Sequence, residues 1–575
     1  MINQTKIYLG ILTVILFSSC SPKKENFGFE KNQDGIVLKK YLGNEKSVNI
    51  PEIVDGQKVI RIAQEAFRGN MEVRKIKIPN SVRTIEDLAF LDCSNLISVS
   101  LPEDLINRED FVNVHTKWIF KGTKIKTFNI KAKTTNISSE NLGRLFNASP
   151  CEEIIVSSKN PSFESKDGVL FEKNLGKLIK YPPQKKEKKY IVPSQTKVIG
   201  PEAFSGKYIE EVVLPDGLIK IESGAFANSP LSKINLPDSL ETIEDAAFYR
   251  TDLTNILIPS KVNEIFRKTF YSFQLRKIEV SPNNPFFSST NGILFNKSKT
   301  IAMYAAPGLP LKSFDIPSET KEIGYSAFAD VTNLTSVNLP AGLALIEEKA
   351  FLGSRINKIK FGSELIRIGH RAFSGSKLSE VTFDEGIITI ESEAFAGSRN
   401  LTKLELPNSL RIIEEEAFKR CVNLRTVKLS LKLSVLGESA FEMTSIEEIE
   451  IPNGVIKIER STFRDCKQLK AAKISKNAEN IEYGAFEDCE SLQQIEIPGS
   501  VKKIGPHAFG GCTNLREVKL NEGTTHIGDW AFGGCGNLSK VNLPSSLSFI
   551  SPTAFRGCKN ISESLMAEIK RFQKQ

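Results

Sequence analysis

The stretch IGPHAFGGCTNLREVKLNEGTTHIG (residues 504–528) contains the unit from which most of this chain is built. Its centre is Phe509, and an equivalent Phe recurs nineteen times in 575 residues, at positions 67, 90, 120, 146, 204, 226, 248, 270, 328, 351, 373, 395, 418, 441, 463, 486, 509, 532 and 555. From Phe328 to Phe555 all ten steps are 22 or 23 residues long. A fixed period of this length predicts a solenoid, in which each turn buries its apolar face against its neighbours.

Each unit combines a short strand with a buried aromatic side chain. Leu515, Val518 and Leu520 form an LxxVxL pattern, and the alternation across its last residues indicates a strand with one face in the core. The position five before the Phe is Ile or Leu in seventeen of the nineteen units. We expect repeat residues such as Phe509 and Phe532 to stack, each contributing about 1.5–3 kcal/mol by burial.

The outward strand positions flank the central apolar residue of each LxxVxL pattern. In the C-terminal half they are Lys358, Lys360, Glu380, Thr382, Lys403, Glu405, Thr426, Lys428, Glu448, Glu450, Ala471, Lys473, Gln494, Glu496, Glu517, Lys519, Lys540 and Asn542. Their charges are mixed and none is aromatic, whereas protein-binding hot spots favour Trp, Tyr and Arg. This strand face is therefore predicted to be a solvated surface.

Two longer units predict β-hairpin inserts. Residues 160–204 align without a gap with residues 284–328, and both contain a turn pair, Asp167-Gly168 or Asn291-Gly292. Asp-Gly and Asn-Gly favour hairpin turns because both residues tolerate positive φ. The Asp34-Gly35 pair within residues 27–43 suggests a similar hairpin that caps the start of the array.

The resulting organisation has seven segments. We expect a signal peptide (1–19), a tether (20–26), an N-terminal hairpin cap (27–62), first repeats with an irregular stretch (63–153), repeats with two hairpins (154–320), a regular array (321–560) and a short capping helix (561–575). The helix is indicated by apolar residues at helical spacing. The irregular stretch 103–150 is a bend, a partial break or a functional insertion, and the sequence does not choose between these.

Exposed aromatic residues for a partner are expected on the hairpins and in the irregular stretch. The candidates are Phe163, Phe286, Phe287, Tyr304 and Trp118. Loops on a rigid scaffold commonly carry binding function. The alternative for each of these residues is local packing of the insert.

Seven of the nine cysteines, Cys512 and Cys535 among them, lie three residues after a repeat Phe. Such residues are expected to be small buried thiols at a tight corner, rather than disulfides or metal ligands. No CxxC pair occurs and there are four His residues, so no metal site is predicted. Signatures such as GxSxG, HExxH and a phosphate-binding loop are also missing, and neither an enzyme nor a cofactor is predicted.

The N-terminus has the layout of a secretory signal. Lys6 precedes an apolar run from Ile7 to Phe17, which ends in Ser18-Ser19-Cys20. Small residues followed by Cys resemble the bacterial lipoprotein signal, which implies lipidation at Cys20. Ser21 rather than Asp after this Cys resembles outer-membrane sorting, which leaves a periplasmic and a surface-exposed orientation both open. The alternative is an ordinary signal peptide with an incidental Cys.

Units such as LPNSLRIIEEEAFKRCVNLRTVKL (406–429) and IPGSVKKIGPHAFGGCTNLREVKL (497–520) resemble the BspA-like leucine-rich repeat family of bacterial cell-surface proteins. The resemblance covers roughly residues 27–560. It implies a leucine-rich repeat solenoid and a non-catalytic role in adhesion or protein binding. The expected partner is a protein or a glycan, not nucleic acid, since a net charge of +9 is mild for this length. The alternative function is a subunit of a glycan-processing envelope system.

Overall fold

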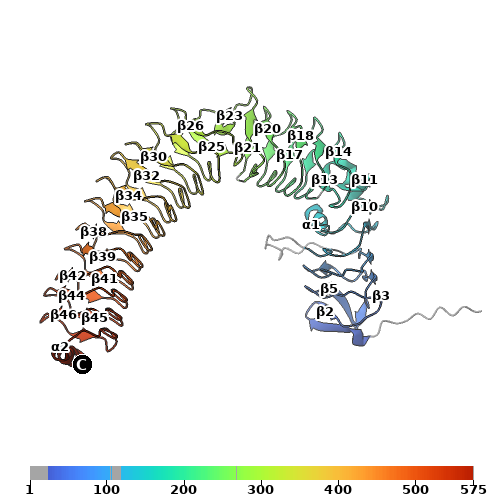
Figure 1. Cartoon of the computed structure of the whole chain (residues 1–575). Coiled ribbons are helices and arrows are strands. Elements are labelled where there is room, and N and C mark those ends of the chain that lie inside the picture. Colours follow the sequence, from blue (N-terminus) through green and yellow to red (C-terminus); the bar gives the residue numbers. More distant parts are fainter. Residues whose placement is uncertain (1–23, 104, 106–117, 207, 267, 574–575) are drawn as a thin grey trace, which may run out of the picture. The chain divides into compact units, whose positions relative to one another are not determined.

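The computed structural model (Figure 1) describes residues 24–573 except 104, 106–117, 207 and 267. Cys20 and the signal peptide lie outside the described residues. The described chain is a β-solenoid with a short C-terminal helix, as predicted, and it divides into two compact units. Unit 1 holds the described residues up to Pro215 and Ile221–Pro230, and unit 2 holds Asp216–Lys220 and those from Leu231 on.

Unit 1 begins with a hairpin and contains one α-helix among its described residues. Its elements are η1 (Lys24–Asn26), β1 (Phe27–Asn32), β2 (Gly35–Tyr41), β3 (Ser47–Asn49), β4 (Ile53–Val54), β5 (Gln57–Ile62), β6 (Lys75–Lys77), β7 (Thr84–Ile85), β8 (Ser98–Ser100), β9 (Thr127–Ile130), α1 (Ser139–Arg144), β10 (Glu153–Val156), β11 (Phe163–Lys166), β12 (Val169–Glu172), η2 (Lys173–Leu175), β13 (Lys177–Lys180), β14 (Lys189–Ile191), β15 (Val198–Ile199) and β16 (Glu211–Val213). Strand β17 (Lys220–Ile221) contains a boundary between the units.

Unit 2 alternates a longer and a two-residue strand through most of its length. The longer strands are β20 (Asn255–Ile258), β22 (Lys277–Val280), β26 (Ser313–Asp315), β28 (Ser336–Asn338), β30 (Lys358–Phe361), β32 (Glu380–Phe383), β34 (Lys403–Glu405), β36 (Thr426–Lys428), β38 (Glu448–Glu450), β40 (Ala471–Lys473), β42 (Gln494–Ile497), β44 (Glu517–Leu520) and β46 (Lys540–Asn542). The two-residue strands are β18 (Lys233–Ile234), β19 (Thr242–Ile243), β21 (Glu264–Ile265), β27 (Glu322–Ile323), β29 (Leu345–Ile346), β31 (Arg367–Ile368), β33 (Thr389–Ile390), β35 (Ile412–Ile413), β37 (Val435–Leu436), β39 (Lys457–Ile458), β41 (Asn480–Ile481), β43 (Lys503–Ile504), β45 (His526–Ile527) and β47 (Phe549–Ile550). The second hairpin contributes β23 (Phe287–Thr290), β24 (Ile293–Asn296) and β25 (Ile301–Ala305), and α2 (Glu563–Phe572) closes the chain.

Parallel pairing keeps each repeat position in its own column. Val518 in β44 pairs with Ile495 and Val541 of the adjacent turns, while Ile504 in β43 pairs with Ile481 and Ile527. Figure 1 shows these two series, with β42, β44 and β46 along one side of the turns and β41 and β45 along the other. Identical positions therefore stack on one another in space.

The core of unit 2 is a stack of the repeat Phe rings. From Phe328 to Phe555, neighbouring ring centroids lie 5.0–5.9 Å apart and the ring planes differ by 2–15°. Phe509 and Phe532 are fully buried in this stack. In unit 1 the rings of Phe120, Phe128 and Phe146 are also in contact, with planes tilted by 52° and 60°, so the described part of the irregular stretch keeps an aromatic core without the parallel stacking.

The corner before most of the repeat Phe residues has a left-handed residue. His507 and Trp530, two positions before their Phe, have φ of 56° and 54°. Such a conformation costs roughly 1–2 kcal/mol for a residue other than Gly. It directs the backbone N–H of His507 to the carbonyl of Asp529 in the next turn, at 2.8 Å. The corner thus adds one hydrogen bond between neighbouring turns to those that the paired strands form.

The described chain forms about 22 turns, and three of these are hairpin turns that are not centred on a repeat Phe. The hairpins β1–β2, β11–β12 and β23–β24 are antiparallel. In the second and third cases, the next strand, β13 or β25, then joins the solenoid in parallel pairing with β15 or β27. The expected inserts are confirmed, and each belongs to a turn of the array.

The second and third hairpin turns, which lie between Phe-centred turns, have a shorter corner than those turns. Phe204 lies five positions after Ile199, whereas Tyr181 lies three positions after Leu178, the counterpart of Ile199. Tyr181 N–H nevertheless donates to the Ala203 carbonyl, the same kind of bond that a repeat Phe makes to the turn after it. Each such turn therefore lacks two corner residues. The corner of the turn before it and the corner of the turn after it face each other across the space that these two residues would fill.

Helix α2 covers the last turn of unit 2. Ser562 caps it by accepting a hydrogen bond from the Leu565 N–H at 3.3 Å. Ile569 is fully buried against the core, and Leu565 and Phe572 pack beside it. The predicted capping helix is confirmed, and it shields the final Phe from solvent.

Candidate functional site

The strand face of unit 2 is exposed and carries charges that pair between neighbouring turns. Lys519 Nζ lies 2.8 Å from Glu496, Lys470 Nζ lies 2.8 Å from Glu447, and similar pairs recur along the array. Exposed pairs of this kind contribute about 0.2–1 kcal/mol each. Because the charges compensate one another, this face has the solvated character expected from the sequence.

The aromatic residues predicted for binding occupy different environments. Phe163 and Phe287 are only 4% and 7% exposed, so the prediction that they face a partner is wrong. The reason is a buried Asn at the start of each hairpin. Asn160 and Asn284 accept hydrogen bonds from the N–H groups of these Phe residues at 2.9 and 2.8 Å, which fold both rings onto the core.

The remaining candidates differ from one another. Phe286 is 48% exposed. Trp118 is half-buried, and Lys121 Nζ lies 3.5 Å from the centre of its ring. Tyr304 is half-buried overall, but its hydroxyl is buried, which contradicts its expected role as an exposed hairpin ring.

The cysteines of the repeat form hydrogen bonds inside the core. Cys512 Sγ donates to the carbonyl of Phe486 in the preceding turn at 3.2 Å, and Cys535 does the same to Phe509. Ser398 makes the equivalent bond to Phe373. Burial raises the pKa of the Cys421 thiol to about 12, which disfavours the reactive thiolate. All eight described cysteines are free.

Within the described residues, no His, Cys, Asp and Glu side chains form a group of three that could hold a metal ion. None of the helices in the described ranges is long and apolar enough to cross a membrane.

The first short corner, in unit 1, is filled by a buried lysine. Lys180 is 1% exposed, and its ammonium donates to Asn147 Oδ1 at 2.5 Å and to the carbonyl of Glu202 at 2.7 Å. The Asn147 amide also donates to the Glu202 carboxylate. Burial lowers the pKa of Lys180 to about 8, while the nearby Glu202 carboxylate opposes that shift. We refer to this group as the first corner.

The second short corner, in unit 2, is closed by tyrosines. The Tyr271 hydroxyl donates to Asp330 Oδ2 at 2.7 Å, which joins the turns before and after the hairpin turn. The Tyr304 hydroxyl is buried and has no hydrogen-bond partner among the described residues. Burial raises the pKa of Tyr304, and the adjacent Tyr271 and Asp330 raise it further.

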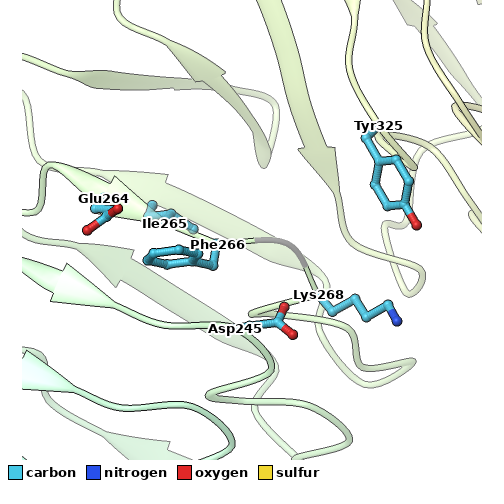
Figure 2. A pocket seen from close by; sticks show the side chains of 6 residues that line it. All are labelled: Asp245, Glu264, Ile265, Phe266, Lys268 and Tyr325. Atoms are coloured by element: carbon cyan, nitrogen blue, oxygen red, sulfur yellow. The ribbon is translucent and has the colours of Figure 1, made fainter.

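A cavity of about 500 Å³ opens at the corner edge of the turns that flank this second hairpin. It is lined by Asp245, Glu264, Ile265, Phe266, Lys268 and Tyr325, and we refer to it as the corner pocket. Figure 2 shows Phe266 and Glu264 together on one side, Asp245 and Lys268 next to them, and Tyr325 across the opening. Residue 267 lies outside the described residues.

Sequence reasoning missed the corner pocket, although one signal for it was present. The position four before the Phe is Glu in eight and Gly in six of the nineteen units, but it is Phe266 in the unit of Phe270. A Glu here forms ion pairs with neighbouring turns, as Glu391 does with Arg367 at 2.7 Å. Phe266 interrupts this column with a ring that is 42% exposed.

Comparisons with known proteins identify the repeat. A family model described as the BspA type leucine rich repeat region matches six times, over residues 44–166, 184–300, 299–425, 346–470, 388–516 and 434–562. No curated protein matches the chain.

Several solved structures are similar to the chain. A leucine-rich cell surface protein from Faecalibacterium prausnitzii is 23% identical, with 72% of this chain and 96% of that chain covered and a TM-score of 0.40. A leucine-rich repeat protein from Bacteroides ovatus is 20% identical, with 93% and 91% covered and a TM-score of 0.24. The pneumococcal vaccine antigen PcpA is 17% identical, with 86% and 97% covered and a TM-score of 0.29.

Proposed function

Because the chain belongs to the BspA-type leucine-rich repeat family, we propose that it is a non-catalytic cell-surface protein that binds a macromolecular partner. The observation that carries this proposal is the continuous stack of repeat Phe rings from Phe328 to Phe555. A rigid core of this kind supports a large ordered surface, which is the feature by which solenoid proteins recognise partners.

The proposal includes a lipid anchor at Cys20. The apolar run from Ile7 to Phe17 followed by Ser18-Ser19-Cys20 supports it. Acyl chains on Cys20 would hold the protein in the outer membrane, since two or more chains anchor far more firmly than one. Residues 20–26 would then be the tether between the membrane and the solenoid.

The location and the binding role can be tested together on cells. Intact cells are treated with protease, and the wild-type protein is compared with Cys20→Ala. We expect the wild type to fractionate with the outer membrane, to carry acyl chains on Cys20 by mass spectrometry and to be cleaved by the protease. An unmodified N-terminus downstream of Cys20 would contradict the anchor, and protection of the wild type from protease would contradict surface exposure.

A further inference from the structure

The two short corners have the same architecture but differ in what fills them. Residues 160–204 and 284–328 align at a constant offset of 124, so Lys180 corresponds to Tyr304. The preceding repeat residues Phe146 and Phe270 have the same offset, so Asn147 corresponds to Tyr271. In the first corner the Lys180 ammonium satisfies the polar groups around it. In the second corner the Tyr304 hydroxyl has no partner among the described residues, and the corner pocket opens between turns on either side of the hairpin turn.

The lining of the corner pocket combines an exposed ring with groups of both charges. Phe266 presents a ring that is 42% exposed, and Glu264 and Lys268 are both exposed beside it. Exposure of this ring is unfavourable in water, since burying a Phe side chain contributes about 1.5–3 kcal/mol. The repeat elsewhere avoids this cost by having Glu or Gly at the same position in fourteen units (8 + 6 = 14).

We propose that the corner pocket binds a glycan, which deepens the proposed function by assigning it a site and a ligand class. The Phe266 ring would cover the apolar C–H face of one sugar. Sugar hydroxyls, which both donate and accept, would donate to the Glu264 carboxylate and accept from the Lys268 ammonium.

Size and charge favour a sugar over a protein surface at this place. A cavity of about 500 Å³ is within the range of roughly 300–1,000 Å³ that is usual for small-molecule sites. A stable protein interface buries about 800 Å² on each partner, far more than six lining residues offer. Glu264 and Lys268 carry opposite charges, which gives little attraction for a strongly charged partner.

The test is a glycan array and a peptide array, both probed with the purified chain from residue 21. Bound glycans are then titrated against the wild type, Phe266→Ala, Glu264→Gln and Phe549→Ala. Phe549 is a matched control because it is also 42% exposed, on β47 away from the corner pocket. We expect wild-type binding to at least one glycan, weakened about tenfold or more by Phe266→Ala, weakened by Glu264→Gln and unchanged by Phe549→Ala.

Every other outcome contradicts glycan binding in the corner pocket. The outcomes also distinguish failure of this inference from failure of the proposed function. If Phe266→Ala still binds the glycan as the wild type does, the glycan binds outside the corner pocket. If the chain binds a peptide and Phe266→Ala abolishes that binding, the ligand of the corner pocket is a peptide and not a glycan. If the wild type binds peptides but no glycan, the corner pocket assignment fails and the proposed function stands. If it binds nothing on either array, both fail. Circular dichroism of Phe266→Ala confirms that the variant is folded.

Discussion

Cys512 illustrates how a single side chain serves the repeat. It is fully buried, and its thiol supplies a second hydrogen bond to the Phe486 carbonyl, which also accepts from the Cys489 N–H. Cys, Ser and Thr occupy this position in different turns, since all three are small and carry a donor. The requirement is therefore for a compact donor and not for sulfur chemistry.

We predict that Cys512→Ser preserves the local stability of this turn better than Cys512→Ala does. The Ser hydroxyl can keep the bond to Phe486, as Ser398 does to Phe373, while Ala loses a bond worth about 0.5–1.5 kcal/mol. Hydrogen exchange at the backbone of the flanking turns measures the difference. Equal exchange rates in both variants would show that the thiol bond contributes nothing.

Lys180 gives the first corner a dependence on pH. Its pKa is about 8 in the folded chain and about 10.4 in an unfolded one. The folded state therefore binds fewer protons between these values, so the buried charge destabilises unit 1 below pH 8, and this cost is relieved as pH rises towards 10.4. We predict that the melting temperature of the wild type rises relative to that of Lys180→Met as the pH is raised from 7.5 to 10. A constant difference across this range would contradict the prediction.

Prediction from sequence succeeded for single residues where the period is strict. The columns of Phe and Cys recur every 22 or 23 residues, so their burial follows from position alone. It failed for Phe163 and Phe287, because Asn160 and Asn284 accept hydrogen bonds from the backbone N–H groups of these residues, and both rings are buried. These Asn residues belong to the longer hairpin units and not to the strict period.

Among the secondary structure elements, helix α2 has the clearest single role, because it ends the array. We predict that Ile569→Asp detaches the helix, since Ile569 is fully buried and an unpaired carboxylate there is costly. Hydrogen exchange should then rise over roughly residues 532–572 and stay unchanged over residues 328–441. Glu568→Gln, on the exposed side of the helix, is the control. Unchanged protection of the last turns in Ile569→Asp would show that the helix does not cap them.

The hairpin elements explain why the pocket itself was not predicted. Their turn pairs, Asp167-Gly168 and Asn291-Gly292, are readable in the sequence. The shortening of the corner by two residues cannot be read from the sequence. It becomes clear only from the pairing of Leu178 with Ile199 and of Ala302 with Ile323. Phe266 was visible as a break in the Glu and Gly column, but its exposure is seen only in the structure.

For the whole molecule, the solenoid predicts that damage stays local. Each turn packs only on its neighbours, so stability is approximately a sum of turn and interface contributions. We predict that Phe509→Ala costs about 3–5 kcal/mol from lost burial and a cavity, with loss of hydrogen-exchange protection centred on residues 481–535. The strand-face variant Lys403→Ala should change nothing. Uniform loss of protection over the array would contradict nearest-neighbour coupling.

The central claim is that this chain acts by binding and not by catalysis. The measurement that tests it most directly is equilibrium binding of the purified chain from residue 21 to arrays of host proteins, envelope proteins and glycans, with substrate turnover assayed on every bound glycan. The account predicts saturable binding to at least one macromolecule, retained in Lys403→Ala and Glu448→Ala, with no turnover. Conversion of a bound glycan to product, or no saturable binding at all, would contradict it.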